Sequence, residues 1–307
     1  MRLGMLTSAL PGLPLEELAR WAETAGFEAL EVAAWPAGAT VGGAADHLDP
    51  VGFGPGDAER VRALFGRHGL TLSALAYYEN PLHPDPVRRA EVHRHLEACI
   101  DAAQLLGVAP VGMFVGRDPA RTVGENLLLA EEALTPLVER AGELGVPLMV
   151  ENCPKPDWHP DRLPGNLAYS PELWEWMFDL GLDLNFDLSH LPGVGIDPVA
   201  ALRPYVDRVR HVQAKDVEVF PELRDRVGYL GPVHRADPAD AQWWRYRAVG
   251  LGGLDWRRLV DVLYEGGFDG VVSVEHEDPV WAGTPERVQA GLGLAQRALR
   301  PLIVSEG

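Results

Sequence analysis

The sequence has little cysteine and few basic residues. Only Cys99 and Cys153 occur among 307 residues, in different stretches and without a recognisable secretory signal. This usage argues against a disulfide-stabilised fold and predicts a cytoplasmic protein. Basic residues number 27 against 45 acidic ones, a formal net charge of −18. Such a charge disfavours nucleic acid and anionic membrane surfaces as partners. No apolar run reaches about 18 residues, so the protein is expected to be soluble.

Several motifs of nucleotide binding and covalent catalysis are also missing. The chain has no P-loop, no Gly-x-Ser-x-Gly segment and no Cys-x-x-Cys pair. The glycines of 250–253 resemble part of a dinucleotide-binding turn, but Asp255 stands at the position of the third glycine, and no strand leads into the segment. The sequence therefore predicts no nucleotide cofactor site of these types.

Apolar residues form short segments that alternate with amphipathic ones. Buried strands are predicted at 2–6, 29–33, 70–77, 108–115, 146–150, 182–186, 209–212 and 271–274. Helices are predicted at 14–25, 57–68, 86–106, 123–144, 171–180, 198–205, 256–265 and 286–299. Regular alternation favours a parallel sheet, and eight repeats favour its closure. The predicted fold class is α/β, a (β/α)8 TIM barrel.

One interval breaks this alternation after the seventh strand. Residues 217–250 are rich in proline, arginine and aromatic residues. Such a segment beside a barrel mouth can shield a polar ligand from water, so we interpret it as a lid-like insertion with Arg247 as a candidate substrate contact. A loop that packs at a subunit interface is the alternative. Residues 1–307 are otherwise predicted to form a single domain, since no linker is recognised.

The last four predicted strands each end near an oxygen-bearing side chain: Glu151, Asp187, Gln213 and Glu275. Chemistry in (β/α)8 barrels takes place at the carboxyl ends of the strands, so these groups are expected to face one site. Three carboxylates and an amide oxygen suit Mg²⁺ or Mn²⁺ better than Zn²⁺. For any single residue, an ion pair with arginine or a helix cap is the alternative.

Two histidines accompany these residues. His190 lies three positions after Asp187 and is interpreted as a partner of a substrate hydroxyl or carbonyl group. The alternative for a lone histidine is a satisfied loop or core residue. His211 lies two positions before Gln213 and is expected to point the same way, but deeper into the barrel. It therefore competes with Gln213 for the role of metal ligand and is a second candidate substrate contact.

Lysine is the scarcest of the charged residues. Only Lys155 and Lys215 occur, and each follows a strand that ends at a proposed ligand. A chain that uses arginine nearly everywhere keeps lysine where a compact point charge is needed, although two residues can fall there by chance. Lys215 is therefore a candidate substrate contact, and Trp35, which follows the second strand, is another.

Four segments around these residues resemble a known family. They are Val-Glu-Asn-Cys-Pro (150–154), Asn-Phe-Asp-Leu-Ser-His (185–190), His-Val-Gln-Ala-Lys-Asp (211–216) and Val-Ser-Val-Glu-His-Glu-Asp (272–278). They are similar to those of the xylose isomerase-like TIM-barrel family of sugar isomerases and epimerases. D-tagatose 3-epimerase, hydroxypyruvate isomerase and inosose dehydratase belong to it. The resemblance covers essentially the whole chain and specifies the family better than the substrate.

The resemblance implies roles for individual residues. The family's four metal ligands correspond to Glu151, Asp187, Gln213 and Glu275, and the first and last of these also move the proton in the epimerases. Many members have histidine at the position of Gln213, whereas hydroxypyruvate isomerase has glutamine there. The expected cation is Mn²⁺ or Mg²⁺, with Co²⁺ and Zn²⁺ as alternatives, and a homodimer or homotetramer is expected. The endonuclease branch needs further histidines at strands three and four, and this chain lacks them.

Three functions follow as hypotheses. The first is a metal-dependent isomerase or epimerase that acts on a small keto-sugar or polyol through an enediolate. The second is a lyase that dehydrates a keto-polyol after the same deprotonation. The third is a non-catalytic barrel that binds a sugar. The sequence does not separate the first two, because both begin with removal of a proton next to a carbonyl group.

Overall fold

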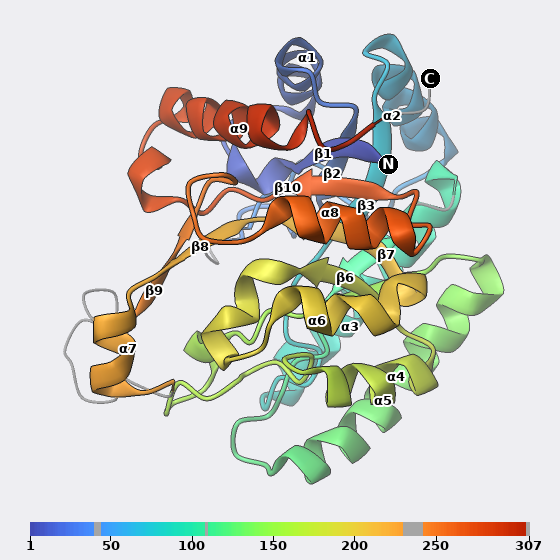
Figure 1. Cartoon of the computed structure of the whole chain (residues 1–307). Helices are drawn as coiled ribbons and strands as arrows, with labels where there is room; N and C mark the ends of the chain where they lie inside the picture. Colours follow the sequence, from blue (N-terminus) through green and yellow to red (C-terminus); the bar gives the residue numbers. More distant parts are fainter. Residues whose placement is uncertain (40–43, 108–109, 230–241, 305–307) are drawn as a thin grey trace.

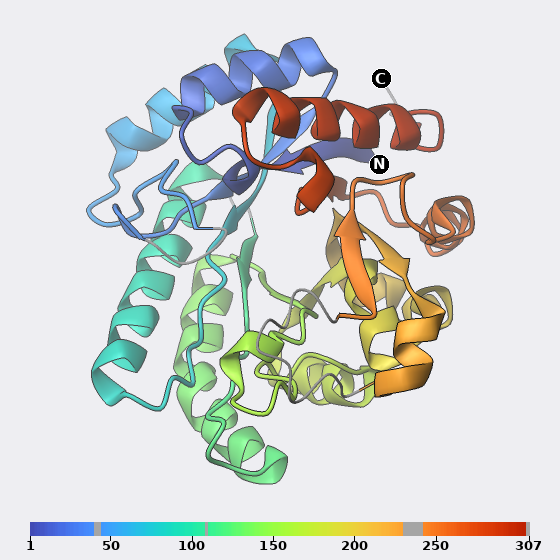
Figure 2. The same cartoon turned by 90° about the vertical axis from the view of Figure 1, so that its left-hand side faces the viewer.

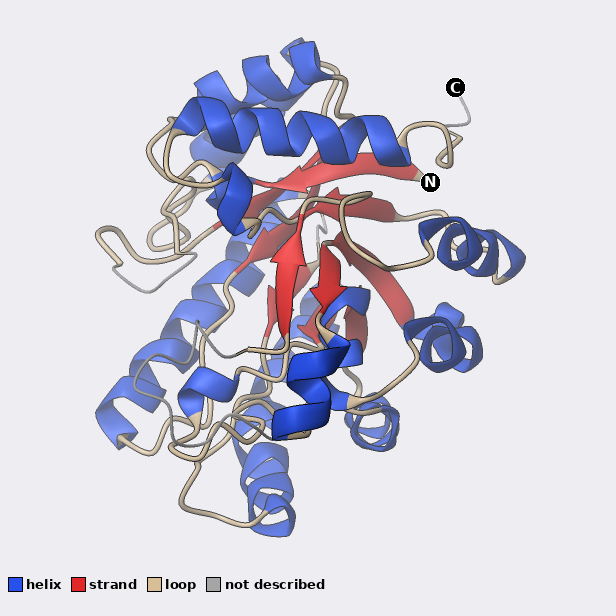
Figure 3. Cartoon of the chain, turned by 60° about the vertical axis from the view of Figure 1, so that its left-hand side comes forward, coloured by secondary structure: helices blue, strands red, loops and turns tan. Residues whose placement is uncertain are grey.

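Eight parallel strands close into a barrel in the computed structural model, which describes residues 1–39, 44–107, 110–229 and 242–304. The strands pair in the order β1-β10-β7-β6-β5-β4-β3-β2, and β2 returns to β1. Figure 3 shows them at the centre, surrounded by helices. The strands are β1 Arg2–Leu6, β2 Ala29–Ala33, β3 Thr71–Ala76, β4 Val111–Met113, β5 Leu148–Glu151, β6 Asp183–Asp187, β7 Val209–Ala214 and β10 Val271–Val274. The predicted (β/α)8 barrel is confirmed.

The helices lie on the outside of the barrel and bury their apolar faces against it. In the first helix Leu18 and Ala22 are buried, and Gly26 ends the helix in the left-handed conformation (φ 83°) that glycine adopts readily. The helices around the barrel are α1 Leu15–Ala25, α2 Pro55–Arg67, α3 Pro86–Leu106, α4 Val123–Leu144, α5 Pro171–Leu180, α6 Pro198–Leu202, α8 Trp256–Glu265 and α9 Pro285–Leu299. No helix of the described residues is long and apolar enough to cross a membrane.

The interval after β7 forms structure that the sequence did not predict. Strand β8 (Asp216–Val219) pairs in antiparallel fashion with β9 (Trp244–Arg247), and α7 (Pro221–Val227) lies between them in the chain. Figures 1 and 2 show this hairpin and helix projecting from one end of the barrel. Residues 230–241 of the predicted lid lie outside the described residues. The lid function stays a prediction.

Polar side chains occupy part of the barrel interior, where apolar residues usually pack. Burying polar groups costs free energy unless they are hydrogen-bonded, so polar side chains in the barrel interior need hydrogen-bond partners there. Several of the strands contribute to this set, whose buried members include Glu31, Ser73, Asn185, His211, Gln213 and Ser273. They lie on β2, β3, β6, β7 and β10.

Candidate functional site

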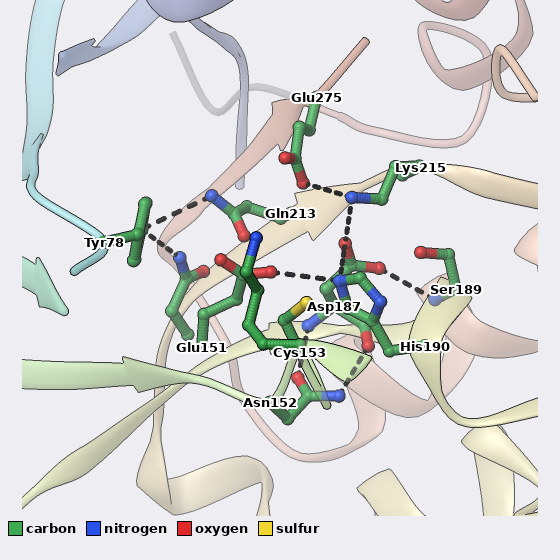
Figure 4. Close-up of polar contacts among 12 residues, drawn as sticks. Tyr78, Glu151, Asn152, Cys153, Asp187, Ser189, His190, Gln213, Lys215 and Glu275 are labelled. Carbon is green, nitrogen blue, oxygen red and sulfur yellow. Dashed lines mark hydrogen bonds and ion pairs between the residues drawn. The ribbon is translucent and has the colours of Figure 1, made fainter. Parts of the chain in front are cut away.

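Three carboxylates meet at the carboxyl ends of strands β5, β6 and β10. Glu151 and Asp187 are the last residues of β5 and β6, and Glu275 directly follows β10. One oxygen from each of these three lies within 4.8 Å of one from each of the others. Gln213 lies on β7, between β6 and β10 in the barrel order, and its Cα is paired with that of Asp187. Figure 4 shows the four side chains directed toward a common space.

An amide locks the ends of β5 and β6 together. Asn152 Nδ2 donates to the backbone oxygen of Asp187, and the backbone N–H of Asp187 donates to Asn152 Oδ1, both at 2.7 Å. The Asp187 carboxylate accepts a hydrogen bond of 2.7 Å from the backbone N–H of Ser189. These bonds extend the contact of the two strands beyond their ladder and fix the position of the Asp187 carboxylate (Figure 4).

The Gln213 amide has one satisfied end and one unsatisfied end. Its Nε2 donates to Glu31 Oε1 at 3.0 Å and to the Tyr78 hydroxyl at 3.3 Å. Its Oε1 is buried and has no hydrogen-bond partner in the described part of the chain. A buried oxygen without a partner is costly, and a cation would satisfy it. Three carboxylates with this amide oxygen therefore fit a divalent cation that prefers oxygen ligands.

A buried lysine lies against the carboxylates. The Lys215 ammonium group is 2.8 Å from Glu275 and 2.7 Å from Glu277, with a side chain only 1% exposed. It is also 3.3 Å from Asp187 and lies over the Tyr246 ring, 4.4 Å from the centroid. Burial alone would lower the pKa of Lys215, but these carboxylates raise it well above its ordinary value. Lys215 is therefore charged.

His190 joins the carboxylates to the hairpin. Its Nε2 lies 3.0 Å from Glu151 Oε1 and 3.2 Å from Asp187 Oδ2, while its Nδ1 lies 2.7 Å from the Tyr246 hydroxyl. Burial by itself would lower the pKa of His190, and the neighbouring Cys153 and Asp187 raise it well above its ordinary value. The imidazole thus carries positive charge beside two of the carboxylates, and its role as a substrate contact stays a prediction.

The family described as xylose isomerase-like TIM barrel matches residues 19–298 of this chain. The chain belongs to that family. It is similar to the uncharacterized protein YfiH of Bacillus subtilis, with 29% identity over 99% of both chains. It is also 29% identical to inosose dehydratase of Clostridium perfringens, in an alignment that covers 52% of each protein. D-psicose 3-epimerase of Clostridium cellulolyticum shares the fold, with a TM-score of 0.69 and 14% identity over 98% of this chain and 99% of that one.

In this member of the xylose isomerase-like family, two predicted site residues lie apart from the carboxylates. His211 hydrogen-bonds Asn185 Oδ1 through Nδ1 (3.2 Å) and Ser73 Oγ through Nε2 (3.1 Å), deeper in the barrel. Burial lowers the pKa of His211 to about 3, so the ring is neutral and both nitrogens are engaged. The geometry thus favours Gln213 over His211 as a ligand.

Arg247 also has its charge satisfied elsewhere. Its guanidinium donates to Glu218 at 2.7 Å and to Asp278 at 3.0 Å. Its neighbours on β9, Arg245 and Tyr246, border the large cavity at the barrel mouth, whereas Arg247 is not among the residues that line it. Arg247 therefore secures the hairpin to the segment after β10, and the structure does not bring it to the site.

A cavity of about 800 Å³ opens over the carboxylates. Trp35, a candidate substrate contact, borders it together with Glu151, His190, Lys215 and Glu275. Its wall is otherwise rich in aromatic rings. A sugar-sized molecule could pack its carbon atoms against these rings, and its oxygens would then be free to contact the charged groups. These other aromatic residues are Tyr78, Phe114, Phe220, Trp244 and Tyr246.

Sequence reasoning missed two acidic residues of this site, Glu31 and Glu277. Glu31 is a carboxylate inside the apolar strand β2, and burial raises its pKa to about 7, against the lowering effect of hydrogen bonds from Tyr78 and Gln213. Glu277 lies two residues after Glu275 in a segment already singled out. The signal for Glu31 was present, because a charged residue between Leu30 and Val32 needs a partner.

Proposed function

We propose that this protein is a divalent-metal-dependent enzyme that isomerises or epimerises a small keto-sugar or polyol through an enediolate. The observation that carries this proposal is the convergence of three carboxylates and one unsatisfied amide oxygen beneath a cavity large enough for a sugar. The structural kinship with an epimerase and the partial sequence similarity to a dehydratase support the same class of chemistry.

The residues proposed to hold the metal are Glu151, Asp187, Gln213 and Glu275. Their oxygens favour Mn²⁺ or Mg²⁺. Cys153 and His190 form a second group with Glu151 whose ligating atoms also lie within 4.8 Å of one another, and this set would suit Zn²⁺ or Co²⁺ once His190 and Cys153 had given up their protons. A bound cation would stabilise the negative charge that develops on the substrate oxygens during deprotonation.

Glu151 and Glu275 are proposed to transfer the proton. They stand on β5 and after β10, two strands apart on either side of β6 and β7, so they can face opposite sides of one substrate carbon. Burial raises the pKa of Glu275 well above its ordinary value; Lys215 lowers it, and Glu277 and Glu151 raise it. A pKa moved toward neutrality suits a group that both accepts and returns a proton.

The remaining polar groups of the cavity are proposed to orient the substrate. Lys215 and protonated His190 are donors beside the carboxylates, where the substrate's oxygens would lie. The Tyr246 hydroxyl holds His190 from the hairpin side at 2.7 Å, so the imidazole cannot rotate freely. Trp35 offers a flat apolar face at the cavity wall. These contacts would fix which carbon faces the two glutamates.

A dehydratase is the second candidate function. The similarity to inosose dehydratase over about half of the chain favours it, and the same two glutamates would begin the reaction. In that case the enediolate would expel a β-hydroxyl group as water instead of taking back a proton. Epimerase and lyase differ only in the fate of this shared intermediate.

One experiment separates these functions. The protein is stripped of metal, loaded with Mn²⁺ and incubated with a panel of ketoses and keto-polyols in D₂O. We expect deuterium at one carbon of an isomeric product, seen by proton NMR and by mass. A product that has lost the mass of water would instead identify a lyase. Binding of a sugar without any deuterium uptake across the panel would contradict both and favour a non-catalytic barrel.

A further inference from the structure

A chain of hydrogen bonds crosses the barrel interior and ends at the proposed metal site. It begins at Ser73 on β3 and passes through His211 on β7 (3.1 Å) to Asn185 on β6 (3.2 Å). Asn185 Nδ2 then donates to the hydroxyl of Tyr78, which follows β3, at 2.7 Å. All of these side chains are buried, so water does not compete for their bonds.

The donor and acceptor atoms of these groups determine which partner donates in each hydrogen bond of this series. Asn185 Oδ1 can only accept a hydrogen bond, so His211 Nδ1 donates to it, and His211 Nε2 accepts from Ser73. Asn185 therefore presents its amide hydrogens to the Tyr78 hydroxyl. Because a hydroxyl has one hydrogen, and the Tyr78 oxygen already accepts from Asn185, that hydrogen is free to be donated onward.

The next hydrogen bond in the series joins Tyr78 to Glu31. Its hydroxyl donates to Glu31 Oε1 at 2.6 Å. The Gln213 Nε2 group then faces two acceptors, Glu31 Oε1 at 3.0 Å and the Tyr78 oxygen at 3.3 Å. If the Gln213 amide were turned over, its own oxygen would face both of them without a hydrogen between. The observed orientation gives the amide hydrogens both acceptors and leaves Oε1 without a partner among the described residues, as Figure 4 illustrates.

The packing around Tyr78 supports its role. A Cβ atom on Gly112 would collide with the Tyr78 hydroxyl, so the absence of a side chain there makes room for the hydroxyl. The rings of Phe114 and Trp35 lie 5.2 Å and 6.0 Å from the Tyr78 ring between centroids. The phenol is thus held from several sides with its oxygen between Asn185 and Glu31.

We infer that Glu31 and Tyr78 are positioning residues that fix the Gln213 amide with its oxygen toward the carboxylates, which makes it a neutral metal ligand. This inference rests on the proposed metal-dependent function. The arrangement resembles in its chemistry a carboxylate that orients a metal-bound histidine through the ring N–H. Here the Gln213 side chain donates through Nε2 to Glu31 and Tyr78, and its Oε1 is the proposed metal ligand.

The test compares metal affinities of the metal-free protein and its variants. Glu31→Leu and Tyr78→Phe should each bind Mn²⁺ about 10–100-fold more weakly by titration calorimetry, because the Gln213 amide loses acceptors that set its orientation. Glu31→Gln should retain most of the affinity, since its amide oxygen can accept from both Tyr78 and Gln213. The Co²⁺ absorption spectrum, which reports coordination, should change in Glu31→Leu and much less in Glu31→Gln.

Thr7→Val is the matched control. Thr7 is buried, and its Oγ1 accepts a hydrogen bond of 2.9 Å from the backbone N–H of Ala33 at the end of β2 and lies 2.9 Å from His47 Nδ1. Valine therefore removes buried polar contacts that do not involve the Gln213 amide. Mn²⁺ affinities of Tyr78→Phe and Glu31→Leu equal to that of Thr7→Val would overturn the inference. Equal losses in Glu31→Leu and Glu31→Gln would also overturn it, because charge and not orientation would then matter.

Two further readouts keep the outcomes separate. Tyr78→Phe changes one oxygen only, so it tests the inference even if Glu31→Leu does not fold, as judged by circular dichroism and thermal unfolding. Wild-type protein that binds neither Mn²⁺ nor Co²⁺ would overturn the metal-dependent function together with this inference. Wild-type protein that binds metal with no turnover of any sugar would contradict the proposed reaction alone and leave the affinity comparison decisive.

Discussion

Replacing Glu275 with glutamine should lower the rate of solvent deuterium exchange at the substrate carbon by about 10²–10⁴-fold while leaving the fold intact. The amide keeps the shape of the side chain and an oxygen that can accept the 2.8 Å bond from Lys215, but it cannot take a proton at neutral pH. Exchange is measured by proton NMR in D₂O with the substrate found in the panel, and Mn²⁺ affinity is measured in parallel.

Glu277→Gln is the matched control for this variant. Glu277 contacts the same Lys215 ammonium at 2.7 Å but is not one of the three converging carboxylates, and its side chain is 44% exposed. Its replacement should reduce exchange much less than Glu275→Gln. Full exchange in Glu275→Gln would remove Glu275 from proton transfer, and equal losses in the two variants would point to the environment of Lys215 instead.

Replacing Lys215 with methionine should lower the free energy of unfolding of the metal-free protein by about 3–5 kcal/mol. The buried ammonium lies within 3.3 Å of Asp187, Glu275 and Glu277, and its loss leaves these carboxylates facing one another. Mn²⁺ should then stabilise the variant more than it stabilises the wild type, since the ion supplies the missing positive charge. Each tenfold gain in affinity adds about 1.4 kcal/mol at saturation.

Arg247→Met provides the comparison for Lys215→Met. Arg247 is also mostly buried and also pairs with two carboxylates, those of Glu218 and Asp278, but it lies outside the cavity wall. This variant should lose stability without any extra gain from Mn²⁺. Urea unfolding with and without MnCl₂ measures both effects. If Mn²⁺ stabilised Lys215→Met no more than the wild type, the ammonium and the metal would not share the same carboxylates.

The sequence predicted the barrel well because its strands and helices carry strong local signals. Strands β1 and β2 and helices α3, α4, α5 and α8 begin and end at the predicted residues. The sixth helix is shorter than expected: α6 ends at Leu202 and a 3₁₀ segment, Arg203–Arg208, follows. Pro204 explains the difference, since it has no N–H to continue the helical bonding.

The parts that the sequence did not predict depend on contacts between distant segments. The β8–β9 hairpin pairs Asp216 with Arg247, and no local sequence pattern predicts that register. Glu31 was overlooked because only carboxylates at strand ends were considered, whereas its hydrogen-bond partners are Tyr78, which follows β3, and Gln213 on β7. His211 was expected deeper in the barrel and lies there, but only the positions of Asn185 and Ser73 reveal that both of its nitrogens are engaged.

The scarcity of lysine has a practical consequence. Of the two lysines in the chain, Lys215 is enclosed, whereas the side chain of Lys155 is 25% exposed and borders the cavity. Reagents that modify amines would therefore react at a single accessible lysine ε-amine, which lies in the wall of the cavity. A fluorophore attached there would report ligand binding in the natural sequence, with no engineered cysteine.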